Sequence, residues 1–271
     1  MMKVSVVQMQ SVDSWELNLE TILRLLDQEK MRNRDLICFP ENSLYMRVVE
    51  GEKIPFQTLD WAGFRQLSEK ARTIHSNLHL GSLPLELEGE PFNASVFVGR
   101  DGSIKSSYQK IHLFDIHLEG RKPIRESDVF RGGSSPQILV HEDWKIGQSI
   151  CYDLRFSELF ARYAAEGADI ILIPAAFLVP TGQAHWDILV RARAIESQCY
   201  VLASCQWGHH KSVKHPEAQR QTYGNTMIVD PWGEVIARVE SGDEVLQADL
   251  EKKVIQKVRD QIPMKNHRRL K

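Results

Sequence analysis

The sequence lacks long apolar runs and blocks of charge of one sign. Its 34 Lys and Arg side chains nearly balance its 36 Asp and Glu side chains, which leaves a formal charge of −2. No apolar run approaches the roughly 18 residues that a membrane-spanning helix needs, and the apolar start at residues 2–8 is too short for a signal peptide. We therefore expect a soluble, cytoplasmic protein with no nucleic-acid or membrane partner.

Cofactor motifs are also scarce. The four cysteines form no CxxC pair, so neither a zinc site nor a disulfide framework is indicated. A GxGxxG or phosphate loop is missing, so nucleotide dependence is not expected. A metal hydrolase remains an alternative, but the neighbouring histidines lack the Glu of an HExxH motif; these are His75 with His79, and His209 and His210 with His215. We predict no cofactor and no metal.

Strand-like and helical stretches alternate along the chain and predict one α/β domain over residues 1–271 with a mixed sheet system. Apolar runs predict strands at residues 3–9, 36–39, 146–151, 169–173 and 200–204. Apolar residues at helical spacing predict helices at residues 15–30, 64–74, 158–165 and 183–198. Turn residues predict two hairpins, 92–98 with 103–108 and 226–230 with 234–239.

Three predicted strands end beside a reactive side chain. Glu41 follows Pro40, Lys110 follows a hairpin strand, and Cys151 stands between an apolar run and a helix. The positive end of a helix should lower a thiol pKa, and such a turn exposes the side chain beside backbone N–H donors. Taken singly, a solvated Glu, a surface Lys and a buried Cys are ordinary features. Their joint context favours catalysis, whereas the other cysteines are best interpreted as small buried apolar residues.

The three segments resemble the nitrilase, or carbon–nitrogen hydrolase, superfamily, whose members carry a Glu-Lys-Cys triad. The glutamate motif matches residues 39–41, Tyr-x-Lys-x-His-Leu-Phe-Asp matches residues 108–115, and Gly-x-x-Ile-Cys-Tyr-Asp-x-Arg-Phe-Pro-Glu matches residues 147–158. One departure is Ser157, which replaces the usual Pro and removes no reactive group. The likeness extends to residues 230–233 and 263–269.

The resemblance implies a four-layer α-β-β-α sandwich that forms a homodimer or a higher homo-oligomer through the helical layer after the cysteine. It also implies Cys151 as nucleophile, Glu41 as general base and Lys110 as a fixed cation at the forming oxyanion, joined by the backbone N–H of Tyr152. The substrate would be a small amide, cleaved with water. Nitriles and N-carbamoyl groups remain open, because the same triad serves all three.

A second carboxylate fits the scheme. Glu126 resembles the family position that orients the lysine and the substrate, while Glu119 is a rival nearer in sequence to Lys110. The alternative for Glu126 is a loop carboxylate paired with Arg121 or Arg125.

Substrate recognition rests on fewer signals. Arg155, four residues after the nucleophile, could hold a substrate carboxylate bidentately, or could form an ion pair with Glu158 or Asp153. Phe177 and Thr181 are further candidates for the pocket wall. The segments 181–201, 206–210 and 223–225 resemble the branch of deaminated glutathione amidase and ω-amidase, and 206–210 favours the former. The alternatives are an ω-amidase, acting on α-ketoglutaramate or α-ketosuccinamate, and a non-catalytic binding protein on the same fold.

Overall fold

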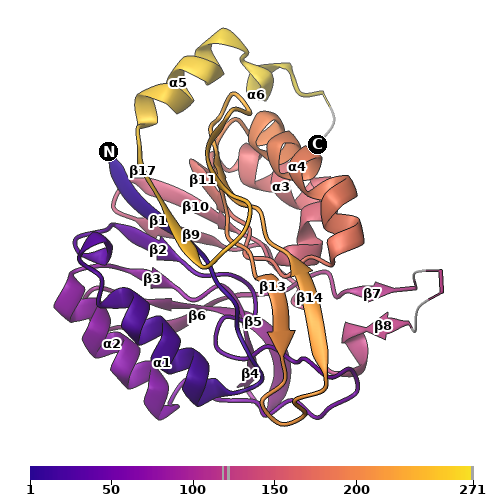
Figure 1. The fold of residues 1–271 in the computed structure, drawn as a ribbon. Coiled ribbons are helices and arrows are strands. Elements are labelled where there is room, and N and C mark those ends of the chain that lie inside the picture. The colour runs from indigo at the N-terminus through magenta and orange to yellow at the C-terminus, as the bar shows by residue number, and fades with distance from the viewer. Residues whose placement is uncertain (118, 121–122, 270–271) are drawn as a thin grey trace.

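The computed structural model describes residues 1–117, 119–120 and 123–269, and its framework is a pair of sheets (Figure 1). The first sheet has the order β17-β1-β2-β3-β5-β4, with β6 paired to β5. Its strands are β1 (Met2–Gln8), β2 (Leu36–Cys38), β3 (Leu78–His79), β4 (Leu83–Leu87), β5 (Glu90–Val98), β6 (Ile104–Gln109) and β17 (Glu244–Leu250). The second sheet has the order β16-β15-β12-β11-β10-β9. Its strands are β9 (Ile138–His141), β10 (Trp144–Gln148), β11 (Ile170–Leu172), β12 (Tyr200–Ala203), β15 (Thr226–Val229) and β16 (Val235–Val239).

Helices cover the outer face of each sheet, as Figure 1 shows. Helices α1 (Trp15–Leu26) and α2 (Ala62–Ile74) pack on the first sheet, and α3 (Ser157–Ala165) and α4 (Val179–Ser197) pack on the second. The C-terminal helices α5 (Lys252–Gln261) and α6 (Met264–His267) follow β17. None of the helices among the described residues has the length and apolarity that crossing a bilayer requires.

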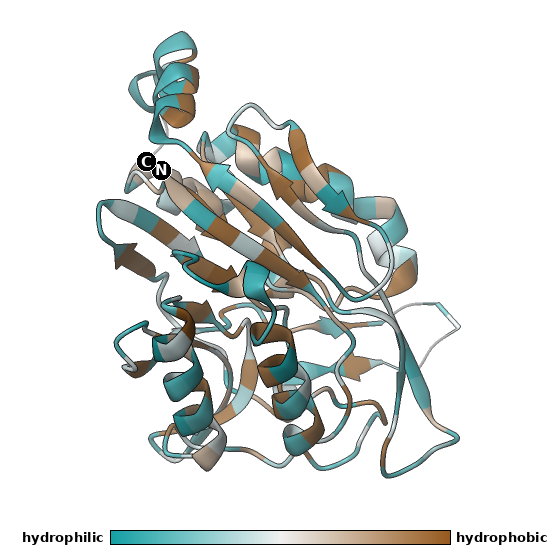
Figure 2. Cartoon of the chain, turned by 60° about the vertical axis from the view of Figure 1, so that its left-hand side comes forward, coloured by the Kyte–Doolittle hydropathy of each residue, from teal (hydrophilic) through white to brown (hydrophobic). Residues whose placement is uncertain are grey.

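Three separate apolar cores account for the layering. In β2, Leu36 and Cys38 belong to the core between the sheets, whereas Ile37 faces α1 and α2. In β11, Ile170 and Leu172 belong to the core between the sheets, and Ile171 faces α3 and α4. Successive side chains of a strand point to opposite faces, so strands buried on both faces appear as continuous apolar runs. Figure 2 shows these apolar strands inside and the polar faces of the helices outside. The predicted α-β-β-α sandwich is confirmed.

Several predicted boundaries are wrong. The helix predicted at residues 15–30 ends at Leu26, and a 3₁₀ turn (Glu29–Met31) follows it. The helix predicted at residues 183–198 begins at Val179, because Pro180 fits the first helical turn. The strand predicted at residues 146–151 ends at Gln148.

Two short hairpins at one end of the sandwich were not predicted. They are β7 (Asp115–Ile116) with β8 (Ile124–Arg125), and β13 (Trp207–Lys211) with β14 (Gln219–Tyr223). Their strands carry many polar side chains and lack an alternating apolar pattern, so periodicity does not reveal them.

Candidate active site

The three reactive side chains predicted from the sequence meet at strand ends of both sheets. Glu41 lies three residues beyond β2, Lys110 directly follows β6, and Cys151 lies three residues beyond β10. The Lys110 Nζ lies 2.9 Å from Glu41 Oε1, and both side chains are buried. All three residues line one cavity. Two strand ends of the first sheet and one of the second therefore build this site.

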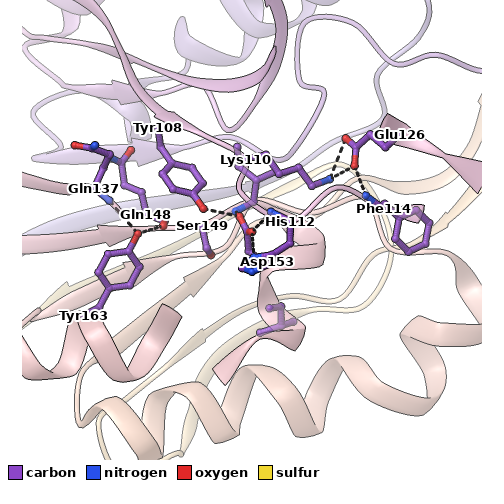
Figure 3. Close-up of polar contacts among 12 residues, drawn as sticks. Tyr108, Lys110, His112, Phe114, Glu126, Gln137, Gln148, Ser149, Asp153 and Tyr163 are labelled. Carbon is purple, nitrogen blue, oxygen red and sulfur yellow. Dashed lines mark hydrogen bonds and ion pairs between the residues drawn. The ribbon is translucent and has the colours of Figure 1, made fainter. Parts of the chain in front are cut away.

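A second carboxylate completes the surroundings of Lys110. Glu126, in the 3₁₀ turn Glu126–Asp128, places Oε2 2.8 Å from Lys110 Nζ (Figure 3). Its Oε2 also accepts a 2.6 Å hydrogen bond from the Phe114 backbone N–H. The rival carboxylate, Glu119, is exposed and does not line the cavity. Of the alternative partners of Glu126, Arg121 lies outside the described residues, and Glu126 pairs with Lys110 rather than Arg125.

Asn93, on β5, joins the two carboxylates and was not predicted from the sequence. Its Nδ2 donates to Glu41 Oε1 at 3.2 Å and to Glu126 Oε1 at 2.9 Å. The Ala176 backbone N–H donates to the other Glu41 oxygen at 3.0 Å. These donors come from a strand and from the backbone, so the fold fixes the positions of both carboxylates. An Asn within an alternating strand gives no sequence signal of this role.

Burial and charge act together on the pKa values of the cluster. Burial disfavours the Lys110 ammonium, but Glu126 and Glu41 outweigh burial and raise the pKa of Lys110 above its usual range. Burial also opposes ionisation of Glu126, yet Lys110 and the hydrogen bonds from Asn93 and Phe114 lower the pKa of Glu126. Lys110 is therefore a cation and Glu126 an anion at neutral pH.

The Cys151 thiol differs from the sequence prediction. Burial raises its pKa well above the ordinary value, the Glu41 carboxylate raises it further, and Lys110 offsets only part of this effect. The predicted lowering of this pKa by a helix end is wrong. Cys151 opens a 3₁₀ turn (Cys151–Arg155), and the α-helix begins only at Ser157, so its positive end lies beyond the first turn's range.

Backbone geometry presents Cys151 to the cavity. The residue has φ of +47°, a left-handed conformation that non-glycine residues seldom adopt, and its N–H donates to the Pro174 carbonyl at 2.9 Å. Such sharp turns after a strand expose a nucleophile. The backbone N–H of the next residue, Tyr152, finds no acceptor within the described part of the chain.

A buried carboxylate, Asp153, holds this turn and was not predicted as a site residue. It accepts four hydrogen bonds: from the backbone N–H groups of Ile150 and His112 at 2.9 Å each, from the Tyr108 hydroxyl at 2.8 Å and from His112 Nδ1 at 2.7 Å. Figure 3 shows Tyr108 and His112 around Asp153. The ring of His112 stacks on Phe156 with centroids 3.7 Å apart. The lysine segment and the cysteine segment are thus tied together through Asp153.

The cavity beside Cys151 measures about 740 Å³ including its open mouth. Arg155, Phe177 and Thr181 line it, as the sequence predicts. The Arg155 guanidinium lies 5.4 Å from the centroid of Phe177 and contacts His185 Nδ1 at 3.2 Å. Neither Glu158 nor Asp153 forms an ion pair with Arg155 in the described residues, so the proposed structural pair is absent there.

Among residues 1–117, 119–120 and 123–269, no group of three or more His, Cys, Asp or Glu side chains could hold a metal ion. His210 instead contacts the Ser11 carbonyl and the Thr222 hydroxyl, at 2.7 Å each.

Comparison with known proteins gives the family. The family model of carbon-nitrogen hydrolases matches residues 3–260. The chain is 35% identical to mouse deaminated glutathione amidase over 98% of its length and 83% of that protein, and 34% identical to ω-amidase NIT2 of Xenopus tropicalis over 93% and 89%. The structure of the Caenorhabditis elegans NitFhit protein superposes with a TM-score of 0.86 at 31% identity, over 99% of this chain and 65% of that longer chain. The predicted resemblance is confirmed: the chain belongs to the carbon–nitrogen hydrolase family and is an amidohydrolase that acts on C–N bonds other than peptide bonds.

Proposed function

We propose that Cys151, Glu41 and Lys110 hydrolyse a small amide through a thioester. The Cys151 sulfur attacks the carbonyl carbon while Glu41 accepts the thiol proton. Because the pKa of the thiol is raised, the sulfur keeps this proton until the attack begins. The tetrahedral oxygen lies beside Lys110 and the Tyr152 backbone N–H, which stabilise its charge. When the C–N bond breaks, Glu41 gives its proton to the leaving amine. The contact of Lys110 with Glu41 in one cavity with Cys151 carries this proposal.

The second half of the reaction reuses the same groups. Water attacks the thioester carbon and gives a proton to Glu41, and a second tetrahedral oxygen forms beside Lys110. Breakage of the C–S bond releases the carboxylic acid and returns a proton from Glu41 to Cys151. Glu126 and Asn93 act as positioning residues, because both hold the Lys110–Glu41 pair in place.

The substrate class follows from the cavity. We propose a γ-linked amide of an α-keto dicarboxylic acid, as in deaminated glutathione, with the acyl carboxylate on Arg155. Support comes from Arg155, which lines the cavity with donors unused by any carboxylate of the described chain. The rival is ω-amidase activity on α-ketoglutaramate, a smaller amide of the same acyl group.

The test compares both amides with the purified protein. We expect a higher kcat/KM for deaminated glutathione than for α-ketoglutaramate, and Arg155→Met should raise KM for both. A preference of tenfold or more for α-ketoglutaramate would establish the ω-amidase instead. An N-carbamoyl amino acid and a nitrile are tested as further substrates. If the protein hydrolyses none of the four compounds, a non-catalytic binding protein is favoured.

Domain organisation and assembly are part of the same proposal. We propose that residues 1–271 act as one domain, since the reactive residues come from both sheets. A homodimer or higher homo-oligomer is supported by apolar side chains exposed on α4 and on the neighbouring β15–β16 turn, namely Ile188, Ile195 and Trp232. Free, buried cysteines support a reducing compartment such as the cytoplasm. Sedimentation of the protein and of Ile188→Glu tests the assembly.

A further inference from the structure

The cavity holds more positive charge than the proposed acyl site uses. Besides Lys110 and Arg155, its lining includes Arg47 and Arg220. Its two carboxylates, Glu41 and Glu126, both contact Lys110. The three arginines therefore face the cavity with no lining carboxylate committed to them.

Arg47 and Arg220 form a cationic position separate from Arg155. Arg155 leaves the turn after Cys151 and packs on Tyr152 and Phe177. Arg47 instead lies on the loop after Glu41, and Arg220 lies on β14. The Arg220 Nη1 donates to the Arg47 carbonyl at 3.3 Å, which joins the hairpin to that loop.

Most donors of these two guanidinium groups are unused. Each guanidinium carries five N–H donors in a planar fork that matches a carboxylate. Arg47 pairs with Glu50 at 2.7 Å, but the Glu50 side chain is half exposed and does not line the cavity. Arg220 has no carboxylate within 4 Å in the described part of the chain, and its one recorded acceptor is the Arg47 carbonyl. A cation without a carboxylate partner in a partly buried wall, next to the Arg47–Glu50 pair, favours an anionic ligand.

The hairpin that carries Arg220 is fixed to the site. The Tyr223 backbone N–H donates to the Phe177 carbonyl at 2.9 Å, and Lys214 contacts Glu52 at 2.7 Å. Arg220 lies three residues before Tyr223, which is roughly 10 Å along an extended strand. Arg220 thus lines the cavity from a strand whose far end is bonded to the Phe177 segment.

We propose that Arg47 and Arg220 form a second anion subsite that binds a carboxylate on the amine half of the substrate. This inference rests on the proposed function, because Arg155 is there assigned to the acyl carboxylate. A carboxylate at the second subsite then belongs to the half that leaves as the amine. The preferred substrate is accordingly an amide with an anionic group on each side of the scissile C–N bond, and an amide whose amine is ammonia leaves the second subsite empty.

The test uses two γ-amides of 2-oxoglutarate that differ only in the amine, glycine or ethanolamine. The wild type should favour the glycine amide in kcat/KM by about tenfold or more, because a site built for an anion rejects the neutral analogue. Arg220→Met should reduce that ratio at least ~5-fold, mainly through KM of the glycine amide, and Arg220→Lys should retain part of it. Lys211→Met is the matched control: it removes an exposed charge from the same hairpin outside the cavity and should preserve the ratio.

The outcomes separate the two proposals. Arg155→Met should raise KM for both amides and leave the ratio of their kcat/KM values unchanged. Equal use of both amides by the wild type, or a ratio unchanged in Arg220→Met, overturns the second subsite while the hydrolase function stands. Absence of turnover for both amides overturns both proposals. If Arg220→Met misfolds, the affinities of the two amides for Cys151→Ala and for Cys151→Ala with Arg220→Lys decide the question, since binding alone then reports the subsite.

Discussion

The Lys110 ammonium lies 2.9 Å from Glu41 Oε1, in a pair almost wholly shielded from solvent. A buried pair of this kind is costly to desolvate, and loss of either partner leaves an uncompensated charge. Here Glu126 adds a second carboxylate to Lys110, and the Asn93 amide donates to both carboxylates. Lys110 therefore remains a fixed cation beside the Glu41 side chain at neutral pH, because Glu126 and Glu41 raise the pKa of Lys110.

Cys151→Ala should lower kcat by on the order of 10⁴-fold or more, since the proposed nucleophile is lost. Iodoacetamide should label Cys151 first, because it is 8% exposed and lines the cavity, whereas Cys38, Cys199 and Cys205 are at most 1% exposed. Peptide mapping of the labelled protein checks this order. Cys199→Ala is the control and should retain most activity; faster labelling of another cysteine, with loss of turnover, contradicts the assignment.

Lys110→Arg should lower kcat at least ~10²-fold although the charge is kept. The Lys110 side chain is buried against two carboxylates, and a guanidinium is larger and has a fixed donor geometry. Steady-state kinetics with circular dichroism separates lost catalysis from lost folding. Lys105→Arg, on the strand that precedes Lys110, is the control, and normal turnover in Lys110→Arg would show that the ammonium has no role at the oxyanion.

Glu126→Gln should change the dependence of stability on pH. Because the folded-state pKa of Glu126 is lowered, its carboxylate stabilises the fold fully above its unfolded-state pKa, about 4.3, and this contribution is lost as pH falls through the folded value. The free energy of unfolding of the wild type should therefore fall more steeply than that of the variant below about pH 5. At pH 7 the variant should be less stable by about 3 kcal/mol, since Lys110 loses a partner.

Urea titrations at several pH values measure this difference. Glu119→Gln is the matched control, because Glu119 is exposed and outside the cavity, and its pH profile should follow the wild type. Parallel profiles for wild type and Glu126→Gln would refute the ionic role of Glu126.

Asp153→Asn should destabilise the protein by about 3 kcal/mol, because an amide cannot accept all four hydrogen bonds and at least one buried donor loses its partner. The kcat/KM of the variant should also fall, mainly because kcat is lower. The substitution displaces the turn that carries Cys151, whereas the cavity wall remains in place. Thermal unfolding and kinetics measure both effects. Asp101→Asn, in an exposed turn, should change neither; a wild-type kcat in Asp153→Asn would show that the turn holds without this carboxylate.

Local signals in the sequence account for much of the site. The apolar runs at β2, β10, β11 and β12 predict buried strands because both strand faces are covered. Glu41, Lys110 and Cys151 appear in motifs at strand ends, so a local pattern reveals them. Asn93 carries no such signal, and Asp153 lies within the cysteine motif without any local sign of its role. Each acts through partners remote in sequence: Asn93 contacts Glu41 and Glu126, and Asp153 contacts His112.

The sequence by itself determined the alternation of strands and helices through local periodicity, and the family and the three candidate catalytic residues through short motifs. The sandwich was predicted from the resemblance to that family. Only the tertiary structure decided that Glu126 and not Glu119 meets Lys110, that burial raises the thiol pKa of Cys151, and that Arg47 and Arg220 share a cavity wall with Arg155. Each of these depends on desolvation and on distances between segments far apart in the chain. Such quantities arise when the sheets pack, so no local stretch of sequence contains them.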